Sequence, residues 1–231
     1  MSHYILFRNP IGGLDIETLG LASTSVVTQI GMFITNWIDL GVHPLKATPP
    51  VDFPKDWTPM VPIAFRADMN YLEQFFDGGT QDEGTVAWWE HQAPGYIDRV
   101  KSNPDAKSVG DVKRSLLEMF NTQRPERPEF VYINHPEFDY RILVTLFGNH
   151  ELISGHRRIV NTAQIHSMLK GLRINESGEG IRWKKHDALE DAAWNVWTTA
   201  AAAASVLRLR LPESVLLSPR FKMLYSTSES P

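Results

Sequence analysis

Two acidic residues, Asp15 and Glu17, are separated by one apolar residue, Ile16, and follow another, Leu14. If this stretch is a strand, side chains two apart project from the same face. Two carboxylates held so close repel each other and stay ionised only when something positive lies between them. A hard divalent cation with oxygen ligands is the usual partner, so the pair is a candidate for half of a metal site. The alternative is an ordinary solvated strand face, since roughly one Asp-x-Glu arises by chance in a chain of this length.

The start of a late helix offers a second candidate. Asp187 followed by Glu190 three positions later is a variant of the capping box, which predicts a helix that begins at Ala188. His186 and Asp191 then occupy the two positions that pack together in a hydrophobic staple, so both face one way at one helix end. A possible general base would then lie beside a possible metal ligand. The alternative is that these acids only cap the helix and favour its dipole, with His186 at the surface.

Asp139 is the third candidate. A short strand is expected at residues 130–133, and Pro136 suits the first position of a following helix. Asp139 would then lie near the end of the first helical turn, just past the carboxyl end of a strand, where sites form in open α/β sheets. The alternative is a surface acid that favours the helix dipole or contacts Arg141 or His135.

The elements that must position these residues indicate an α/β fold. Strands followed by alternating helices and strands favour a mixed sheet, an antiparallel meander and then parallel strands, flanked by helices. Six prolines between residues 42 and 62 predict a long irregular loop. The expected strands are residues 4–7, 11–17, 25–35, 36–41, 130–133 and 158–161, and the expected helices are residues 69–76, 85–92, 108–121, 136–147, 162–171 and 187 to about 209.

Composition narrows the class of protein. The chain has 231 residues, of which 42% are hydrophobic, so a sizeable core is possible. The absence of cysteine excludes a disulfide scaffold and thiolate metal sites and fits a cytosolic protein. We expect no membrane span, because no apolar run reaches ~18 residues, and no signal peptide, because the N-terminus lacks a long apolar core.

Charge is unevenly distributed along the chain. Residues 1–100 contain 12 acids and 5 Lys or Arg, a net charge of −7, whereas residues 101–231 contain 15 acids and 18 Lys or Arg, a net charge of +3. A basic footprint over the whole protein is therefore absent. Any polyanion must be met locally or through metal ions.

Taken together and in this order, the three motifs resemble those of the DEDDh 3′-5′ exonucleases of the ribonuclease T and DnaQ-like superfamily. The residues that carry the resemblance are Leu14-Asp15-Ile16-Glu17-Thr18, Asn134-x3-Phe138-Asp139 and His186-x-Ala188-x2-Asp191-Ala192. Two further stretches, Thr18-Leu19-Gly20 and residues 85–92, are most similar to the phage exodeoxyribonuclease A (DexA) branch and its bacterial exoribonuclease relatives. The resemblance covers about residues 11–207.

Two features depart from the family pattern. Family members usually carry an apolar run just before the first Asp, where this chain has Gly12-Gly13 after Pro10. We therefore expect a first strand that is short or kinked at its start. The Pro-rich insert at about residues 42–62 has no counterpart in the motifs.

The resemblance implies a ribonuclease H-like fold, with one exonuclease domain over residues 1–217 and a polar C-terminal tail over residues 218–231. It implies hydrolysis of phosphodiester bonds from the 3′ end of DNA or RNA, with a preference for single strands, and release of nucleoside 5′-monophosphates. The implied location is the cytoplasm of a bacterium or of a phage-infected host.

The resemblance also implies two divalent ions, Mg²⁺ or Mn²⁺. Asp15 would contact both ions, Glu17 and Asp191 would hold the ion that carries the attacking water, and Asp139 would hold the other. His186 would accept the proton of that water. The residues expected at the substrate are Thr18, Leu19, Trp88, Asn134 and Lys185.

Several alternatives stay open at this stage. The chain is alternatively a non-catalytic nucleic-acid-binding or protein-binding module on the same fold, a metal phosphatase for small nucleotides, or an exoribonuclease specialised for RNA ends. No side chain that senses a 2′-hydroxyl is identifiable, so DNA and RNA are not distinguished. Trp88 and Trp89 are candidates to stack on a terminal base or to pack in the core, and the oligomeric state is left open.

Overall fold

The structure is a computed structural model, which describes residues 10–36, 63–121, 128, 130–148, 158–171 and 186–206. Five strands form one mixed sheet in the order β3-β2-β1-β4-β5. β1, β2 and β3 pair antiparallel, whereas β4 pairs parallel with both β1 and β5. The strands are β1 Pro10–Thr18, β2 Val27–Asn36, β3 Ile63–Asp68, β4 Phe130–Ile133 and β5 Arg158–Asn161. The α/β fold of ribonuclease H-like type is thereby confirmed.

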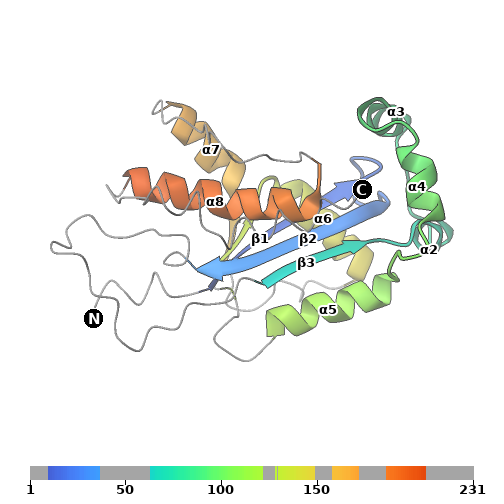
Figure 1. The fold of residues 1–231 in the computed structure, drawn as a ribbon, viewed down its shortest axis with the longest axis horizontal. Helices are drawn as coiled ribbons and strands as arrows, with labels where there is room; N and C mark the ends of the chain where they lie inside the picture. Colours follow the sequence, from blue (N-terminus) through green and yellow to red (C-terminus); the bar gives the residue numbers. More distant parts are fainter. Residues whose placement is uncertain are drawn as a thin grey trace, which may run out of the picture.

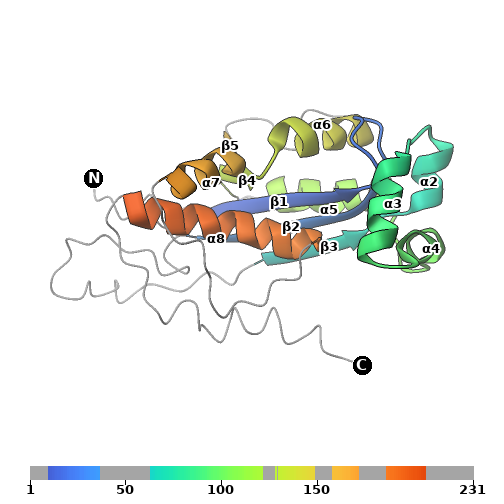
Figure 2. The same ribbon diagram turned by 90° about the horizontal axis from the view of Figure 1, so that it is seen from above.

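Helices cover both faces of this sheet. They are α2 Tyr71–Phe76, α3 Glu83–Gln92, α4 Tyr96–Ser102, α5 Val109–Asn121, α6 Pro136–Phe147, α7 Thr162–Gly171 and α8 Ala188–Val206. The long helix α8 lies along one face, against β1 and β2, with α7 beside it, and α5 lies on the opposite face (Figure 1). Helices α2, α3 and α4 gather at one end of the sheet, near the first residue of α8 (Figure 2).

Side chains alternate along β1 between the two faces. Leu14 and Ile16 are buried in the main core, together with residues of α5 and α6 such as Val112 and Ile142. Burying two such side chains stabilises the fold by about 1.5–3 kcal/mol each. A shift in strand register by one residue would expose both and bury the acids between them, so the alternation determines which face carries the carboxylates.

Two glycines allow α8 to lie directly on the sheet. A Cβ atom on Gly13 would lie 1.9 Å from the carbonyl oxygen of Ala192, and one on Gly31 would lie 2.0 Å from the carbonyl carbon of Ala188. Both distances are far below van der Waals contact, so no side chain fits at either position. The glycine at 13, which departs from the apolar run expected there, therefore has a structural reason: the helix occupies the space of the missing side chain. The short or kinked start expected for this strand is not observed, because β1 keeps one register with β2 from Pro10 to Glu17, and its register shift lies at the other end, between Glu17 and Thr18.

A smaller second core lies under α2, α3 and α4. Its buried members are Leu19, Val26, Tyr71, Trp89 and Ile97. The indole N–H of Trp89 donates to the carbonyl of Thr18 at 2.9 Å. This core joins the three short helices to the carboxyl end of β1.

Most of the expected elements are present. The strands expected at 11–17, 25–35, 130–133 and 158–161 and the six expected helices occur with boundaries that move by a few residues at most. A third strand of the meander was expected at residues 36–41, but Asn36 is the last residue of β2, and the strand that pairs with β2 is β3, which follows the Pro-rich stretch. Residues 4–7, 37–62 and 207–231, which include the proline-rich insert and the predicted tail, lie outside the described residues.

Helix α4 was also not expected. It begins directly after Gly95, which has a φ of 73°, and the carboxylate of Glu90 accepts the backbone N–H groups of Gly95 at 2.7 Å and Ile97 at 2.8 Å. A side chain of the preceding helix thus satisfies N–H groups at the start of α4. That partner comes from another element, and no local pattern in the sequence reveals it.

Among the helices of the described part of the chain, none is long and apolar enough to cross a membrane.

Candidate active site

Asp15 and Glu17 project from the α8 side of the sheet, as the alternation along β1 requires. In the antiparallel pairing, Asp15 lies opposite Gly31 and Glu17 lies opposite Gln29. Because Gly31 has no side chain, the first turn of α8 reaches the sheet beside Asp15. Both acids are partly buried beneath that helix.

The first turn of α8 brings a histidine and an acid to the same end of the helix. One oxygen of Asp187 accepts the backbone N–H groups of Leu189 at 3.2 Å and Glu190 at 3.4 Å, which is the N-cap expected from the sequence. The carboxylate of Asp191 accepts the backbone N–H of His186 at 3.1 Å. His186 has a φ of 66°, so the chain turns sharply before the helix begins.

Glu17, His186 and Asp191 converge in space although they are far apart in the sequence. Each offers one possible ligand atom, and these atoms all lie within 4.8 Å of one another. Two carboxylates and an imidazole at this separation match the ligand types of a divalent metal site.

Asp139 reaches the same centre from the other side of β1. It lies in the first turn of α6, which begins at Pro136 after the carboxyl end of β4, as expected. Its side chain is buried, and its backbone N–H donates to the carbonyl of His135 at 3.0 Å. The charge of Asp139 raises the pKa of both acids of β1, which places it in the same electrostatic cluster.

Burial and mutual repulsion change the acidity of the cluster. Burial, followed by the charges of Asp139, Glu17 and Asp191, raises the pKa of Asp15 well above its usual value. Burial, followed by the charge of Asp191, raises the pKa of Glu17 to about 8. Burial also raises the pKa of Asp139 to about 7.

The donor set fits hard divalent ions. Burial, and for Asp15 and Glu17 also the charges of the neighbouring acids, raises the pKa of Asp15, Glu17 and Asp139. Cations between the carboxylates would relieve this repulsion. Carboxylate oxygens are the ligands that Mg²⁺ and Mn²⁺ prefer. The residues that could hold such ions are Asp15, Glu17, Asp139 and Asp191, with the imidazole of His186 next to them.

Two tryptophans of α3 flank the imidazole. The ring of Trp88 meets His186 edge-on with centroids 4.7 Å apart, and that of Trp89 does so at 5.7 Å. Trp89 is buried and stacks on Tyr96, whereas Trp88 is 40% exposed. Trp89 therefore packs in the core, and Trp88 is the one of the pair that presents ring surface beside the site.

Four of the five residues expected at the substrate lie in the described part of the chain. Thr18 and Leu19 are buried behind the acids, and the hydroxyl of Thr18 donates to the carbonyl of Gly20 at 2.8 Å. Asn134 follows β4, and its side-chain oxygen accepts the hydroxyl of Thr162 at 3.5 Å. Lys185 lies outside the described residues, and the contacts of all five with a substrate stay predictions.

Sequence reasoning did not identify the group of side chains that anchors α8. Arg66 on β3 donates to the buried carboxylate of Asp187. Gln29 accepts the backbone N–H of Ala188 at 2.7 Å and donates to Asp68 at 2.8 Å. The sequence did contain a signal for β3: after Pro62, the last proline of the Pro-rich stretch, Arg66 and Asp68 alternate with apolar residues.

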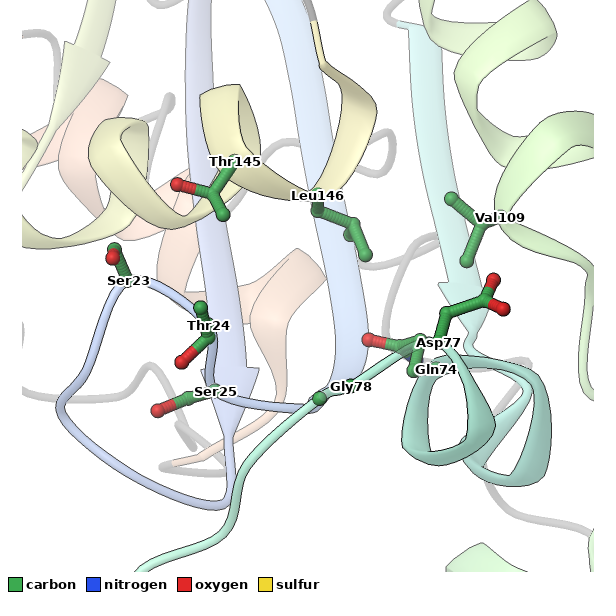
Figure 3. A pocket seen from close by; sticks show the side chains of 10 residues that line it. Ser23, Thr24, Ser25, Gln74, Asp77, Gly78, Val109, Thr145 and Leu146 are labelled. Atoms are coloured by element: carbon green, nitrogen blue, oxygen red, sulfur yellow. The ribbon is translucent and has the colours of Figure 1, made fainter.

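A cavity of about 140 Å³ lies between the loop after β1, the end of α2 and the end of α6 (Figure 3). Its lining is mostly small or neutral, with Ser23, Thr24 and Thr145 on one side and Asp77 on the other. None of the five residues of the acidic centre lines it. It therefore adds no group to the candidate site.

Comparison with protein families identifies a match over most of the chain. The model of a family described as the 3′-5′ exoribonuclease Rv2179c-like domain matches residues 13–203. No curated protein matches the chain. The matched range includes the four acids and the histidine of the centre.

Proposed function

Because the chain belongs to the Rv2179c-like 3′-5′ exoribonuclease family, we propose that it removes nucleotides from the 3′ ends of RNA by two-metal-ion hydrolysis. The carrying observation is the convergence of four acids and a histidine at the start of α8, within a domain of that family. We assign it to the DEDDh exonucleases, with the phage exodeoxyribonuclease A (DexA)-like branch as its nearest group.

Each residue of the centre has a proposed task. Asp15, Glu17 and Asp191 would hold one ion, and Asp15 with Asp139 would hold the other. When bound, Mg²⁺ or Mn²⁺ supplies positive charge that offsets the carboxylates and polarises the scissile phosphodiester and the attacking water. This local charge lets a protein of net charge −4 accept a polyanion.

His186 acts as the general base. It accepts a proton from the attacking water, whose oxygen forms a new bond to phosphorus while the bond from phosphorus to the 3′ oxygen breaks. The 3′ oxygen takes up a proton from solvent and stays on the shortened strand as a hydroxyl, and a nucleoside 5′-monophosphate leaves. His186 then releases its proton to solvent. Trp88 holds the imidazole by its edge contact and offers its exposed face to the terminal base.

The decisive experiment is digestion of labelled RNA oligomers by the purified protein. Single-stranded, double-stranded and overhang-bearing RNA, with matched DNA, are incubated with Mg²⁺, Mn²⁺ or chelator. We expect stepwise shortening from the 3′ end of RNA in either metal and none in chelator. Asp15→Ala abolishes it, whereas Asp105→Ala, at an exposed acid distant in the sequence from the centre, does not.

A wild-type protein that leaves every oligomer intact in both metals would overturn this function. Cleavage confined to mononucleotide esters would point to a phosphatase instead. Cleavage of DNA at the same rate as RNA would retain the mechanism but contradict the RNA preference.

A further inference from the structure

A cavity of about 190 Å³ lies beside the acidic centre, between the start of β2, the end of β3 and α4. Its polar lining comes from Thr28, Gln29, Arg66, Asp68, Tyr96, Arg99 and Asn103. None of these residues resembled any motif in the sequence, and the centre described above does not use the space.

This cavity adjoins the proposed catalytic residues directly. Gln29 is the register partner of Glu17, and the hydroxyl of Thr28 donates to the backbone carbonyl of Glu17 at 3.1 Å. The same hydroxyl shares a hydrogen bond of 2.8 Å with the hydroxyl of Tyr96. One residue of β2 therefore separates the cavity from a proposed metal ligand.

Two guanidinium groups give the cavity its charge. Arg66 donates to Asp187 at its inner end. Arg99 donates to the backbone carbonyls of Pro94 at 2.8 Å and Ala93 at 3.5 Å, which are neutral acceptors. Among the described residues, no carboxylate forms a contact ion pair with Arg99, although backbone hydrogen bonds and then its charge help to lower the pKa of Glu90 on α3. A guanidinium has five N–H donors, so Arg99 retains donors for a ligand besides those given to the two carbonyls.

The one carboxylate in the lining already has donors of its own. Asp68 accepts from the side chains of Gln29 at 2.8 Å and Asn103 at 3.4 Å, and Arg66 lies 3.8 Å from it. Its oxygens therefore face these groups. The hydroxyl hydrogens of Thr28 and Tyr96 are already donated, to the carbonyl of Glu17 and to Thr28 respectively. The donors that remain for a ligand are the other N–H groups of Arg99, whose planar guanidinium matches the oxygens of a phosphodiester.

We propose that this cavity binds the phosphodiester next to the one that is cleaved. The terminal nucleotide brings only the scissile phosphate, so any second phosphate belongs to the strand on the 5′ side of the cut. Arg99 is then a substrate-binding residue that contributes only when the RNA has at least three nucleotides. This assignment rests on the proposed exoribonuclease function.

Two short substrates isolate the contribution of the cavity. A dinucleoside monophosphate contains the scissile phosphodiester alone, whereas a trinucleoside diphosphate contains one more. The rate of the first cleavage, as kcat/KM, is measured on both for the wild type, Arg99→Gln, Arg99→Lys and Arg114→Gln. Arg114 is a matched control, because it is an exposed arginine on α5 paired with Asp111.

We expect Arg99→Gln to lower kcat/KM on the trimer about tenfold, the loss of one charged hydrogen bond, and to leave the dimer within about twofold. Arg99→Lys restores part of the loss, and Arg114→Gln changes neither substrate. The salt dependence on the trimer also becomes shallower in Arg99→Gln, by about 0.7 in the logarithmic slope for each phosphate that the protein no longer neutralises.

Equal losses on dimer and trimer, or no loss on either, would overturn the assignment of the cavity while the exoribonuclease function stood. A wild type that cleaves neither of these substrates nor any longer RNA would overturn the function, and the cavity assignment with it. The two failures are therefore distinguishable in one data set.

Discussion

Glu17 and Asp139 are buried acids that ionise in the unfolded chain near their usual pKa values of 4.5 and 3.8. In the folded protein their pKa values are about 8 and about 7. Between these limits the folded state holds protons that the unfolded state has released. The stability that these groups contribute is therefore fully present at low pH and is lost as pH rises toward 8.

The raised pKa values therefore predict that the protein without metal becomes less stable as pH rises. In chelator, the melting temperature of the protein should fall as pH rises from about 4 to about 8, because each group loses stability over its own window. Mn²⁺ should remove most of this fall. Glu17→Gln should be more stable than the wild type at pH 8 in chelator, by on the order of a few kcal/mol. Melting curves that rise with pH in chelator would contradict the raised pKa values.

The proposed role of His186 as general base can be tested by removing its imidazole. His186→Ala should lower kcat by about 100-fold or more, the usual contribution of a general base, while the Mn²⁺ concentration that half-saturates thermal stabilisation stays near that of the wild type. The measurements are RNA cleavage from pH 6 to 9 and metal titration by melting temperature. Near-full activity across that range would exclude the role of general base.

Among elements, the contact between β1 and α8 matters most for the site. Gly13 and Gly31 have backbone atoms of the helix where a Cβ would lie. Any side chain there must move the first turns of α8, which carry His186 and Asp191. The packing of α8 on the sheet at Gly13 and Gly31 therefore determines where the proposed metal ligand Asp191 lies.

We predict that Gly13→Ala lowers stability by about 1–3 kcal/mol or more, the usual cost of forcing an atom into a packed interior, and weakens Mn²⁺ binding as well. Gly110→Ala is the matched control, because a Cβ there meets nothing closer than 3.9 Å and the residue lies in a helix. Urea unfolding and Mn²⁺ titration test both variants. A Gly13→Ala protein with unchanged metal affinity would show that the helix relaxes without moving the site.

The sequence was informative where a signal is local. The alternation of Asp15 and Glu17 with apolar residues predicted the strand, and the cap at Asp187 predicted the start of α8. The fold class followed from the order of these elements. Long-range contacts were not accessible: the pairing of Arg66 with Asp187 joins residues 121 positions apart, and the proline-rich stretch before β3 hid the third strand of the meander.

The net charge of the whole molecule provides a test that distinguishes a metal-dependent nuclease from a non-catalytic RNA-binding module. The chain has a net charge of −4, and its acidic centre would repel RNA without cations. We therefore predict that chelator weakens RNA affinity as well as stopping cleavage, with the largest effect at low salt. Fluorescence anisotropy measures this affinity, with Asp15→Asn as a variant that we expect to bind RNA without cutting it. An affinity that is unchanged in chelator would favour a non-catalytic binding module.

The proposed centre is assembled from segments at opposite ends of the described chain, Asp15 on β1, Asp139 in α6, and His186 and Asp191 at α8. A ribosome makes β1 early and α8 last among these elements. A growing chain that stops before residue 186 lacks both the proposed general base and one of the proposed metal ligands. We therefore expect a nascent chain to be inactive as a nuclease until α8 has been made and has docked against Gly13 and Gly31.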